Sequence, residues 1–349
     1  MKSKNLSNKI LRLIKSKGFK NIELDPVLET KYILQRSGEN IRKYLFSFYN
    51  SDGRELCLRP DLTISSLLRY AQNNINAKEK VFYTGSAFRK SYNKKNVVVK
   101  QIGMEIFSSK NENKDDKEIL DTSIKIIKKI GFKKANVKIG NFKLFELLIK
   151  KLSMPQRWKS RLLKFYWNEK YFSELLKRLQ SNSDIDPIVV AGDKKNYLKM
   201  KKENPNKIIA GRSYREIIER YERKINDPRT VETGKYSVKI IREFLKIHCS
   251  IDKIERILKD FIKKYKLSKN ILSDLTAIKN LSKISYKTIF LTNFGRDIEY
   301  YTGIVFEIYN SSKKEIARGG RYDGLLKSLG SKKNISAVGA AINLNNLKK

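Results

Sequence analysis

Charged and phenolic side chains crowd one short segment near the C-terminus, RDIEYYTGIVFE at residues 296–307. Arg296 could bind a carboxylate as a two-pronged charged donor, and Tyr300 and Tyr301 could hydrogen-bond a small polar ligand. The apolar residues 304–306 predict a core strand that begins where these side chains end. The segment therefore predicts one wall of a ligand pocket; structural ion pairs and core tyrosines are the alternative.

A second segment with binding chemistry is LRPDLT at residues 58–63. The carboxylate of Asp61 and the hydroxyl of Thr63 could accept hydrogen bonds from a ligand ammonium group. Two structural roles compete with this interpretation, because Asp61 could pair with Arg59 or cap a helix predicted to begin at Leu62.

A third segment, VKQIGMEIF at residues 99–107, predicts a strand. Gln101 and Glu105 are four residues apart, so both side chains should point to one face of that strand, as the floor of a pocket requires. A structural ion pair between Glu105 and Arg296 is the alternative.

The elements that must position these residues form one sheet domain interrupted by helices. Two strand-like runs meet at the Asp52–Gly53 pair, a strong hairpin signal. From about residue 142 to 285, apolar residues recur at helical spacing instead. We expect an α+β fold in which an antiparallel sheet is flanked by helices. The expected divisions are a first part of the sheet domain at 1–178, a helical insertion at 179–285 and a second part of the sheet domain at 286–349.

Composition narrows the class of protein. Of 349 residues, 40% are hydrophobic, which supports a substantial core, and no run approaches the roughly 18 apolar residues of a membrane span. Without a signal-peptide pattern at the N-terminus, we expect a cytoplasmic protein. The cysteines Cys57 and Cys249 and the single histidine, His248, match no metal-ligand spacing. The net charge of +40 is spread along the chain, which indicates compositional bias, with RNA binding as the alternative.

Four segments, in order, resemble the catalytic domain of histidyl-tRNA synthetase, a class II aminoacyl-tRNA synthetase. They are IELDPVLE around Pro26, LRPDLT, FRKS with VKQIGMEIF (88–107), and RDIEYYTGIVFE with ARGGRYDGLLKSLG (317–330). The resemblance implies a synthetase-like fold, a homodimer formed near Pro26 and a histidine pocket. In that pocket the resemblance implies that Asp61 and Thr63 bind the ammonium group of histidine and that Arg296 binds its carboxylate. Glu105 and Tyr301 would each contact one imidazole nitrogen. Gln101 would bridge the ligand and the sheet, and Tyr300 would also line the pocket.

The resemblance weakens where a synthetase binds ATP. Arg89 remains at the position that faces the α-phosphate in the family, but Ser91 stands where a glutamate usually helps to seat the adenine. Asn346 stands where the family places an arginine on the γ-phosphate, and asparagine supplies no positive charge. The chain ends at Lys349, so we also expect no anticodon-binding domain.

The chain keeps the residues of the amino-acid pocket but departs from the synthetases at the positions that bind ATP. This combination resembles the family of ATP phosphoribosyltransferase regulatory subunits, and so do the segments LRPDLT and IGNFKLFELLI (139–149). This resemblance implies a non-catalytic protein without cofactor or metal, with histidine as allosteric ligand. It also implies a hetero-oligomer with a short-form catalytic subunit in histidine biosynthesis, with neither tRNA nor a membrane as partner. Two alternatives are a divergent histidine-activating enzyme and a non-catalytic RNA-binding relative.

Overall fold

The computed structural model divides the chain into two compact units. It describes residues 2–37, 39–73, 77–90, 97–181, 187–203, 208–209, 212–225, 230–274, 286–295 and 300–347. The first unit comprises Met1–Lys143, His248–Leu258 and Leu272–Lys349, and the second comprises Leu144–Ile247 and Lys259–Ile271.

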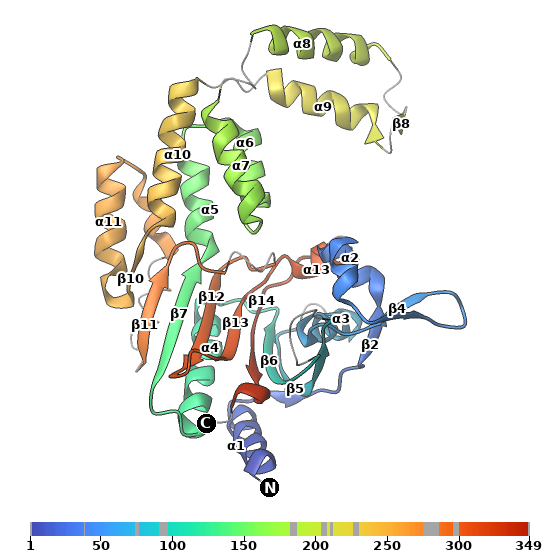
Figure 1. Cartoon of the computed structure of the whole chain (residues 1–349), viewed down its shortest axis with the longest axis vertical. Coiled ribbons are helices and arrows are strands. Elements are labelled where there is room, and N and C mark those ends of the chain that lie inside the picture. The colour runs from blue at the N-terminus through green and yellow to red at the C-terminus, as the bar shows by residue number, and fades with distance from the viewer. Residues whose placement is uncertain are drawn as a thin grey trace. The chain divides into compact units, whose positions relative to one another are not determined.

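A mixed sheet forms the centre of the first unit (Figure 1). Within the described residues it has nine strands. In spatial order these are β1 (Lys20–Asn21), β5 (Glu79–Phe88), β6 (Val98–Phe107), β14 (Ala337–Asn343), β13 (Glu315–Arg321), β12 (Ile304–Asn310), β7 (Ala135–Asn141), β11 (Lys287–Leu291) and β10 (His248–Ser250). All neighbours run antiparallel except β1–β5 and β7–β11, which are parallel. The predicted α+β class is confirmed, with these two parallel pairs added.

Helices pack against this sheet. The helices of this unit are α1 (Lys2–Ser16), α2 (Thr30–Ser37), α3 (Leu62–Asn73), α4 (Glu112–Lys129) and α13 (Leu325–Ser328), with 3-10 turns η1 (Glu39–Tyr44), η2 (Ile251–Lys253) and η4 (Leu344–Asn346). Helix α3 packs on β5 and β6, whereas α4 packs on β6, β13 and β14. In β6 the buried Ile102, Met104 and Ile106 alternate with Gln101 and Glu105, as a strand between two layers requires.

A small second sheet contains the predicted hairpin. Strands β2 (Val27–Glu29), β4 (Glu55–Leu58) and β3 (Ser47–Tyr49) pair antiparallel in that order. Between β3 and β4, the Asn50 side chain accepts hydrogen bonds from the backbone N–H groups of Asp52 (3.1 Å) and Arg54 (2.8 Å). Gly53 adopts a φ of 74°, which glycine takes without strain. The local turn chemistry thus fixes the hairpin.

Arg321, at the end of β13, ties the sheet to α4. Its guanidinium contacts Asp116 at 2.7 Å and Asp323 at 2.9 Å, and it also donates to the Ser336 hydroxyl (2.8 Å) and the Glu112 carbonyl (3.1 Å). Arg321 is buried, and burial raises the pKa of Asp116 to about 6 despite the guanidinium beside it. These contacts link the end of β13 to α4 and to the segments that carry Asp323 and Ser336.

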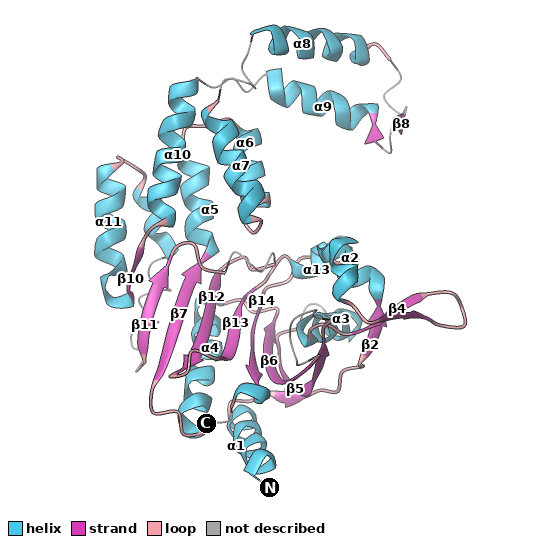
Figure 2. Ribbon diagram, viewed as in Figure 1, coloured by secondary structure: helices cyan, strands magenta, loops and turns pink. Residues whose placement is uncertain are grey.

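The second unit is a helical assembly (Figure 2). Its elements are α5 (Phe142–Lys151), α6 (Gln156–Lys164), α7 (Glu169–Gln180), α8 (Pro187–Lys201), β8 (Ile208–Ile209), β9 (Arg212–Ser213), α9 (Tyr214–Ile225), α10 (Val231–Leu245), the end of α11 (Ile254–Lys264) and the start of η3 (Lys269–Asp274). Among the described helices of the chain, none is both long and apolar enough to cross a membrane.

This unit overlaps the predicted insertion at 179–285 but begins earlier, at Leu144, and residues 248–258 of that range belong to the first unit, where β10 pairs with β11. Aromatic packing is the reason for the earlier start. Phe145 of α5 stacks on Tyr166 with ring centroids 4.2 Å apart, and it meets Phe172 of α7 at 5.9 Å. These contacts join α5 and α7 to the helical core.

Candidate functional site

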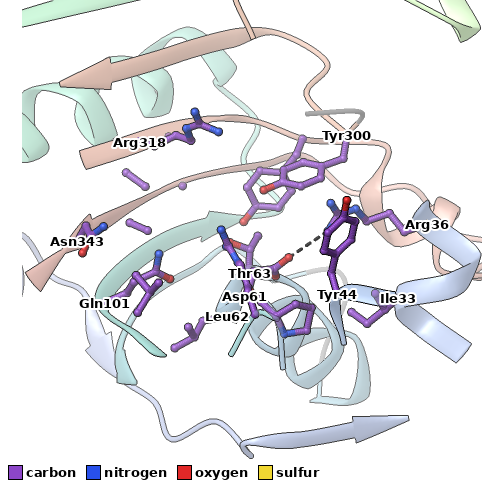
Figure 3. A pocket seen from close by; sticks show the side chains of 18 of the residues that line it. Ile33, Arg36, Tyr44, Asp61, Leu62, Thr63, Gln101, Tyr300, Arg318 and Asn343 are labelled. Carbon is purple, nitrogen blue, oxygen red and sulfur yellow. Dashed lines mark hydrogen bonds and ion pairs between the residues drawn. The ribbon is translucent and has the colours of Figure 1, made fainter. Parts of the chain in front are cut away.

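A cavity of about 470 Å³ opens in the first unit, a volume that suits a small-molecule ligand (Figure 3). Side chains from α2, η1, β6, β13 and β14 line it, together with the turn before α3 and the segment before β12. Six of the residues identified from the sequence are among them: Asp61, Thr63, Arg89, Gln101, Tyr300 and Tyr301. Two others, Ser91 and Arg296, lie outside the described residues.

Asp61 uses one carboxylate oxygen to cap a helix and the other to form an ion pair. Its Oδ1 accepts the backbone N–H of Ile64 at 3.0 Å, which caps α3 as the structural alternative predicted. Its Oδ2 forms an ion pair with Arg36 Nη1 at 3.0 Å. The predicted pairing with Arg59 is wrong, because that guanidinium donates to three backbone carbonyl groups instead.

Arg36 is a site residue that the sequence did not reveal. It extends from the last turn of α2 into the cavity lining, and its Cζ lies 4.7 Å from the centre of the Tyr300 ring. Figure 3 shows the guanidinium beside that ring, with the ion pair to Asp61 as a dashed line. Its local sequence, TKYILQRS, does not distinguish it from a solvent-facing helical arginine. Only the tertiary fold brings it to Asp61.

Glu105 lies beneath the cavity and is only 1% exposed. Its Oε1 accepts hydrogen bonds from the hydroxyls of Tyr83 (2.6 Å) and Thr63 (3.2 Å), and its Oε2 accepts one from Tyr322. Burial raises the pKa of Glu105 to about 7, although the hydrogen bonds from Tyr322 and Tyr83 oppose that rise. The protein itself therefore supplies partners for both oxygens, and the predicted contact with an imidazole stays a prediction.

Glycines make room for this hydroxyl–carboxyl cluster. Gly339 on β14 lies opposite Glu105 on β6, and a Cβ added there would come within 1.4 Å of the carboxylate. A Cβ on Gly103 would come within 2.2 Å of the Tyr83 ring. Both strands must therefore lack side chains at these points for the cluster to fit.

Three tyrosine rings bound the cavity beside this cluster. The Tyr300 ring lies 4.9 Å from that of Tyr301 and 5.9 Å, edge to face, from that of Tyr322. Burial raises the pKa of Tyr300 to about 12, and it also raises the pKa values of the other two tyrosines. All three phenols are therefore neutral hydrogen-bond donors at physiological pH.

The described residues at the positions where synthetases bind ATP do not form a cluster of positive charges that could hold phosphate groups. Arg89 lines the cavity, and its Nε donates to the Pro60 carbonyl at 2.7 Å. Asn346 is not among the described residues that line the cavity; its side chain donates to the Glu315 backbone carbonyl at 2.7 Å. Arg318, which the sequence did not single out, also lines the cavity but forms an ion pair with the Glu315 carboxylate at 3.0 Å.

Comparison with known proteins identifies the family of this chain. The family model described as histidyl-tRNA synthetase matches residues 1–347. Curated proteins named ATP phosphoribosyltransferase regulatory subunit are similar over nearly the whole chain. The one from Allorhizobium ampelinum is 28% identical and covers 94% of this chain and 92% of its own. The one from Brucella anthropi is 26% identical and covers 93% of this chain and 92% of its own.

Solved structures share the fold. A Bacillus halodurans protein, described as an ATP phosphoribosyltransferase regulatory subunit/histidyl-tRNA synthetase, is similar with a TM-score of 0.63 and 19% identity, over 99% of this chain and 78% of its own. Histidyl-tRNA synthetase from Nostoc sp. PCC 7120 gives a TM-score of 0.62 and 18% identity, over 99% of this chain and 70% of its own. With the family model matching residues 1–347, the chain belongs to the histidyl-tRNA synthetase family.

Proposed function

We propose that this chain is a non-catalytic regulatory subunit of ATP phosphoribosyltransferase, required for the first step of histidine biosynthesis and for its feedback regulation by histidine. One observation carries the proposal: the curated relatives with that name match over more than nine-tenths of this chain and of their own length. Its partner would be a short-form catalytic subunit, in a cytoplasmic complex that includes neither tRNA nor a membrane.

The cavity supports histidine as the allosteric ligand. Asp61 and Thr63 offer oxygen acceptors for an ammonium group, Gln101 offers an amide, and the neutral phenols of Tyr300 and Tyr301 can donate to an imidazole nitrogen or a carboxylate. Feedback requires histidine to bind more tightly to one state of the complex than to the other. Coupling of about 1–3 kcal/mol would change the affinity of the catalytic subunit for its own ligand roughly 5–150-fold.

The ATP-related positions support a role without catalysis and without a cofactor. Forming an aminoacyl adenylate places developing negative charge on phosphate oxygens, which synthetases stabilise with fixed cations. The neutral side chain of Asn346 donates to a backbone carbonyl, and Arg318 is engaged by Glu315 and Glu307. These contacts argue against an active adenylation site.

Self-association is part of the proposal, through the small sheet that follows Pro26. Its outer strand β3 pairs only with β4 among the described residues, and it exposes Phe48 (43%) and Tyr49 (72%). An unpaired strand edge with exposed aromatic residues is suited to pairing with a second copy. Sedimentation of the wild type and of a Phe48→Lys/Tyr49→Lys variant tests this point. The variant should dissociate into monomers at protein concentrations at which the wild type remains a dimer.

The decisive experiment measures phosphoribosyl-ATP formation by a matching short-form catalytic subunit alone, with this protein, and with this protein plus histidine. The rate should change on mixing and fall when histidine is added. Glu105→Ala should weaken the response to histidine, whereas Glu39→Ala, which removes an exposed carboxyl of the same unit, should not. A rate that is identical in all mixtures would contradict the proposal. Histidine-dependent ATP–pyrophosphate exchange would then test the histidine-activating alternative.

A further inference from the structure

Asp61, the residue expected to hold a ligand ammonium group, already holds a cation from the protein itself. We propose that Arg36 is a specificity-determining residue that competes with the ligand ammonium for Asp61, so that an amino-acid ligand binds by displacing the guanidinium. The inference rests on the proposed function, because it takes the cavity as the histidine site. It adds a residue and a mode of selection that neither the sequence nor the family relationship indicated.

The two oxygens of Asp61 are not equivalent. Oδ1 accepts the backbone N–H of Ile64 and cannot leave without uncapping α3. Oδ2 is therefore the oxygen on which a cation can be exchanged, and Arg36 Nη1 occupies it at 3.0 Å. Both side chains are only 18% exposed. In such a partly buried place, a guanidinium and an ammonium on the same carboxylate repel each other, which favours one cation at a time on Oδ2.

The remaining contacts of Arg36 make this arrangement displaceable. Its guanidinium lies over the Tyr300 ring, which attracts a cation but fixes its position less strictly than a second ion pair would. Its Nε is buried without a hydrogen-bond partner among the described residues. A buried donor left unsatisfied is unfavourable, so moving the side chain to a place where Nε is solvated offsets part of the loss of the ion pair.

The other described arginines that line the cavity have partners elsewhere. Arg89 donates to the Pro60 carbonyl, and Arg318 pairs with Glu315. Of the described arginines that line the cavity, only Arg36 forms an ion pair with Asp61. A ligand that carries an ammonium group therefore meets Arg36 as a competitor, whereas a ligand without one does not.

Three ligands separate these cases when their binding is measured by calorimetry at about pH 8, where imidazole is neutral. Histidine carries both an ammonium and a carboxylate, histamine carries only the ammonium, and imidazolepropionate carries only the carboxylate. The full-length wild type is compared with Arg36→Gln. The variant should bind histidine and histamine about tenfold more tightly, the size expected for losing one charged hydrogen-bond competitor. Its affinity for imidazolepropionate should not rise.

Two further variants control for charge and folding. Arg54→Gln removes the same charge from the exposed β3–β4 hairpin, where Arg54 pairs with Asp52, and should leave all three affinities unchanged. Arg36→Lys keeps a charge but loses the flat guanidinium, so it should tighten the two ammonium ligands less than Arg36→Gln does. Circular dichroism of each variant checks that it is folded.

The results that would overturn the inference are distinct from failure of the proposed function. Weaker binding of histidine and imidazolepropionate by Arg36→Gln, with histamine unaffected, would make Arg36 a carboxylate receptor instead of a competitor. Equal affinities in the wild type and Arg36→Gln, or no binding of either ammonium ligand to the variant, would also overturn it. A catalytic subunit that still responds to histidine in any of these cases would leave the regulatory function standing. Only loss of that response contradicts the function itself.

Discussion

Replacing Glu105 with glutamine should make the stability of the first unit much less dependent on pH. The pKa of Glu105 is raised from 4.5 to about 7 in the folded protein, chiefly by burial. A carboxyl whose pKa rises on folding binds its proton more tightly in the folded state. Its contribution to stability is therefore complete below about pH 4.5 and is lost as the pH rises through about 7.

The size of the effect follows from the same two pKa values. Each pKa unit corresponds to about 1.4 kcal/mol, so the wild type should lose about 3 kcal/mol of unfolding free energy across this range. A glutamine amide resembles the protonated carboxyl, since each has one acceptor oxygen and one donor group. Wild type and Glu105→Gln should thus be similarly stable at about pH 4.5, and the variant should be more stable by up to about 3 kcal/mol at about pH 8.

The assay must report on the unit that contains Glu105. Both tryptophans, Trp158 and Trp167, lie in the second unit, so their fluorescence would follow the wrong transition. Amide hydrogen exchange in β6 and β14, measured at several pH values and corrected for intrinsic exchange rates, reports the opening of the first unit. Glu39→Gln, which removes an exposed carboxyl, serves as the control. Parallel pH profiles for wild type and Glu105→Gln would refute the reasoning, as would a wild type that gains stability relative to the variant with rising pH.

Three further substitutions test the packing around the site and in the helical unit. Gly339→Ala would place a Cβ against Glu105 and should destabilise the first unit by about 2 kcal/mol or more in urea unfolding, whereas Gly192→Ala, in open space on α8, should not destabilise the protein and should add up to about 1 kcal/mol through helix propensity. Arg321→Met leaves a buried carboxylate without its cation and should cost about 3 kcal/mol or more, seen as a lower midpoint of thermal unfolding. Gly234→Ala would place a Cβ 2.0 Å from a backbone carbonyl of α7 and should lower the urea midpoint of the second unit, followed by tryptophan fluorescence. Unchanged midpoints in these variants would contradict the packing described.

Local chemistry made part of the fold predictable. The Asp52–Gly53 hairpin depends on turn residues that act within a few positions, and the strand with Gln101 and Glu105 is recognisable from its alternation. The two parallel strand pairs were not predicted, because they depend on which distant segments become neighbours. Helical spacing from about residue 142 did indicate where the helical unit begins, at Leu144, but the predicted division at 179 placed these first helices with the sheet, because the packing of Phe145 on later helices leaves no periodic signal.

The candidate site shows the same division. The cap that Asp61 provides follows from its position before a helix, and that prediction is confirmed. The partners of Glu105 come from residues 22 and 217 positions away, and no short pattern links Tyr83 or Tyr322 to that carboxyl. Arg36 was missed for the same reason, because its role arises only when α2 packs near the start of α3.

The hydrogen bonds to Glu105 also give the site a mechanical property. One carboxyl joins side chains carried by β5, by α3 and by the chain after β13, while it is itself fixed to β6. A ligand that draws one of these hydroxyls away breaks the hydrogen bond between its segment and β6. We therefore expect occupancy of the cavity to loosen the segment that loses its hydrogen bond to Glu105, a change that amide hydrogen exchange in β5, β6 and the start of α3 would register.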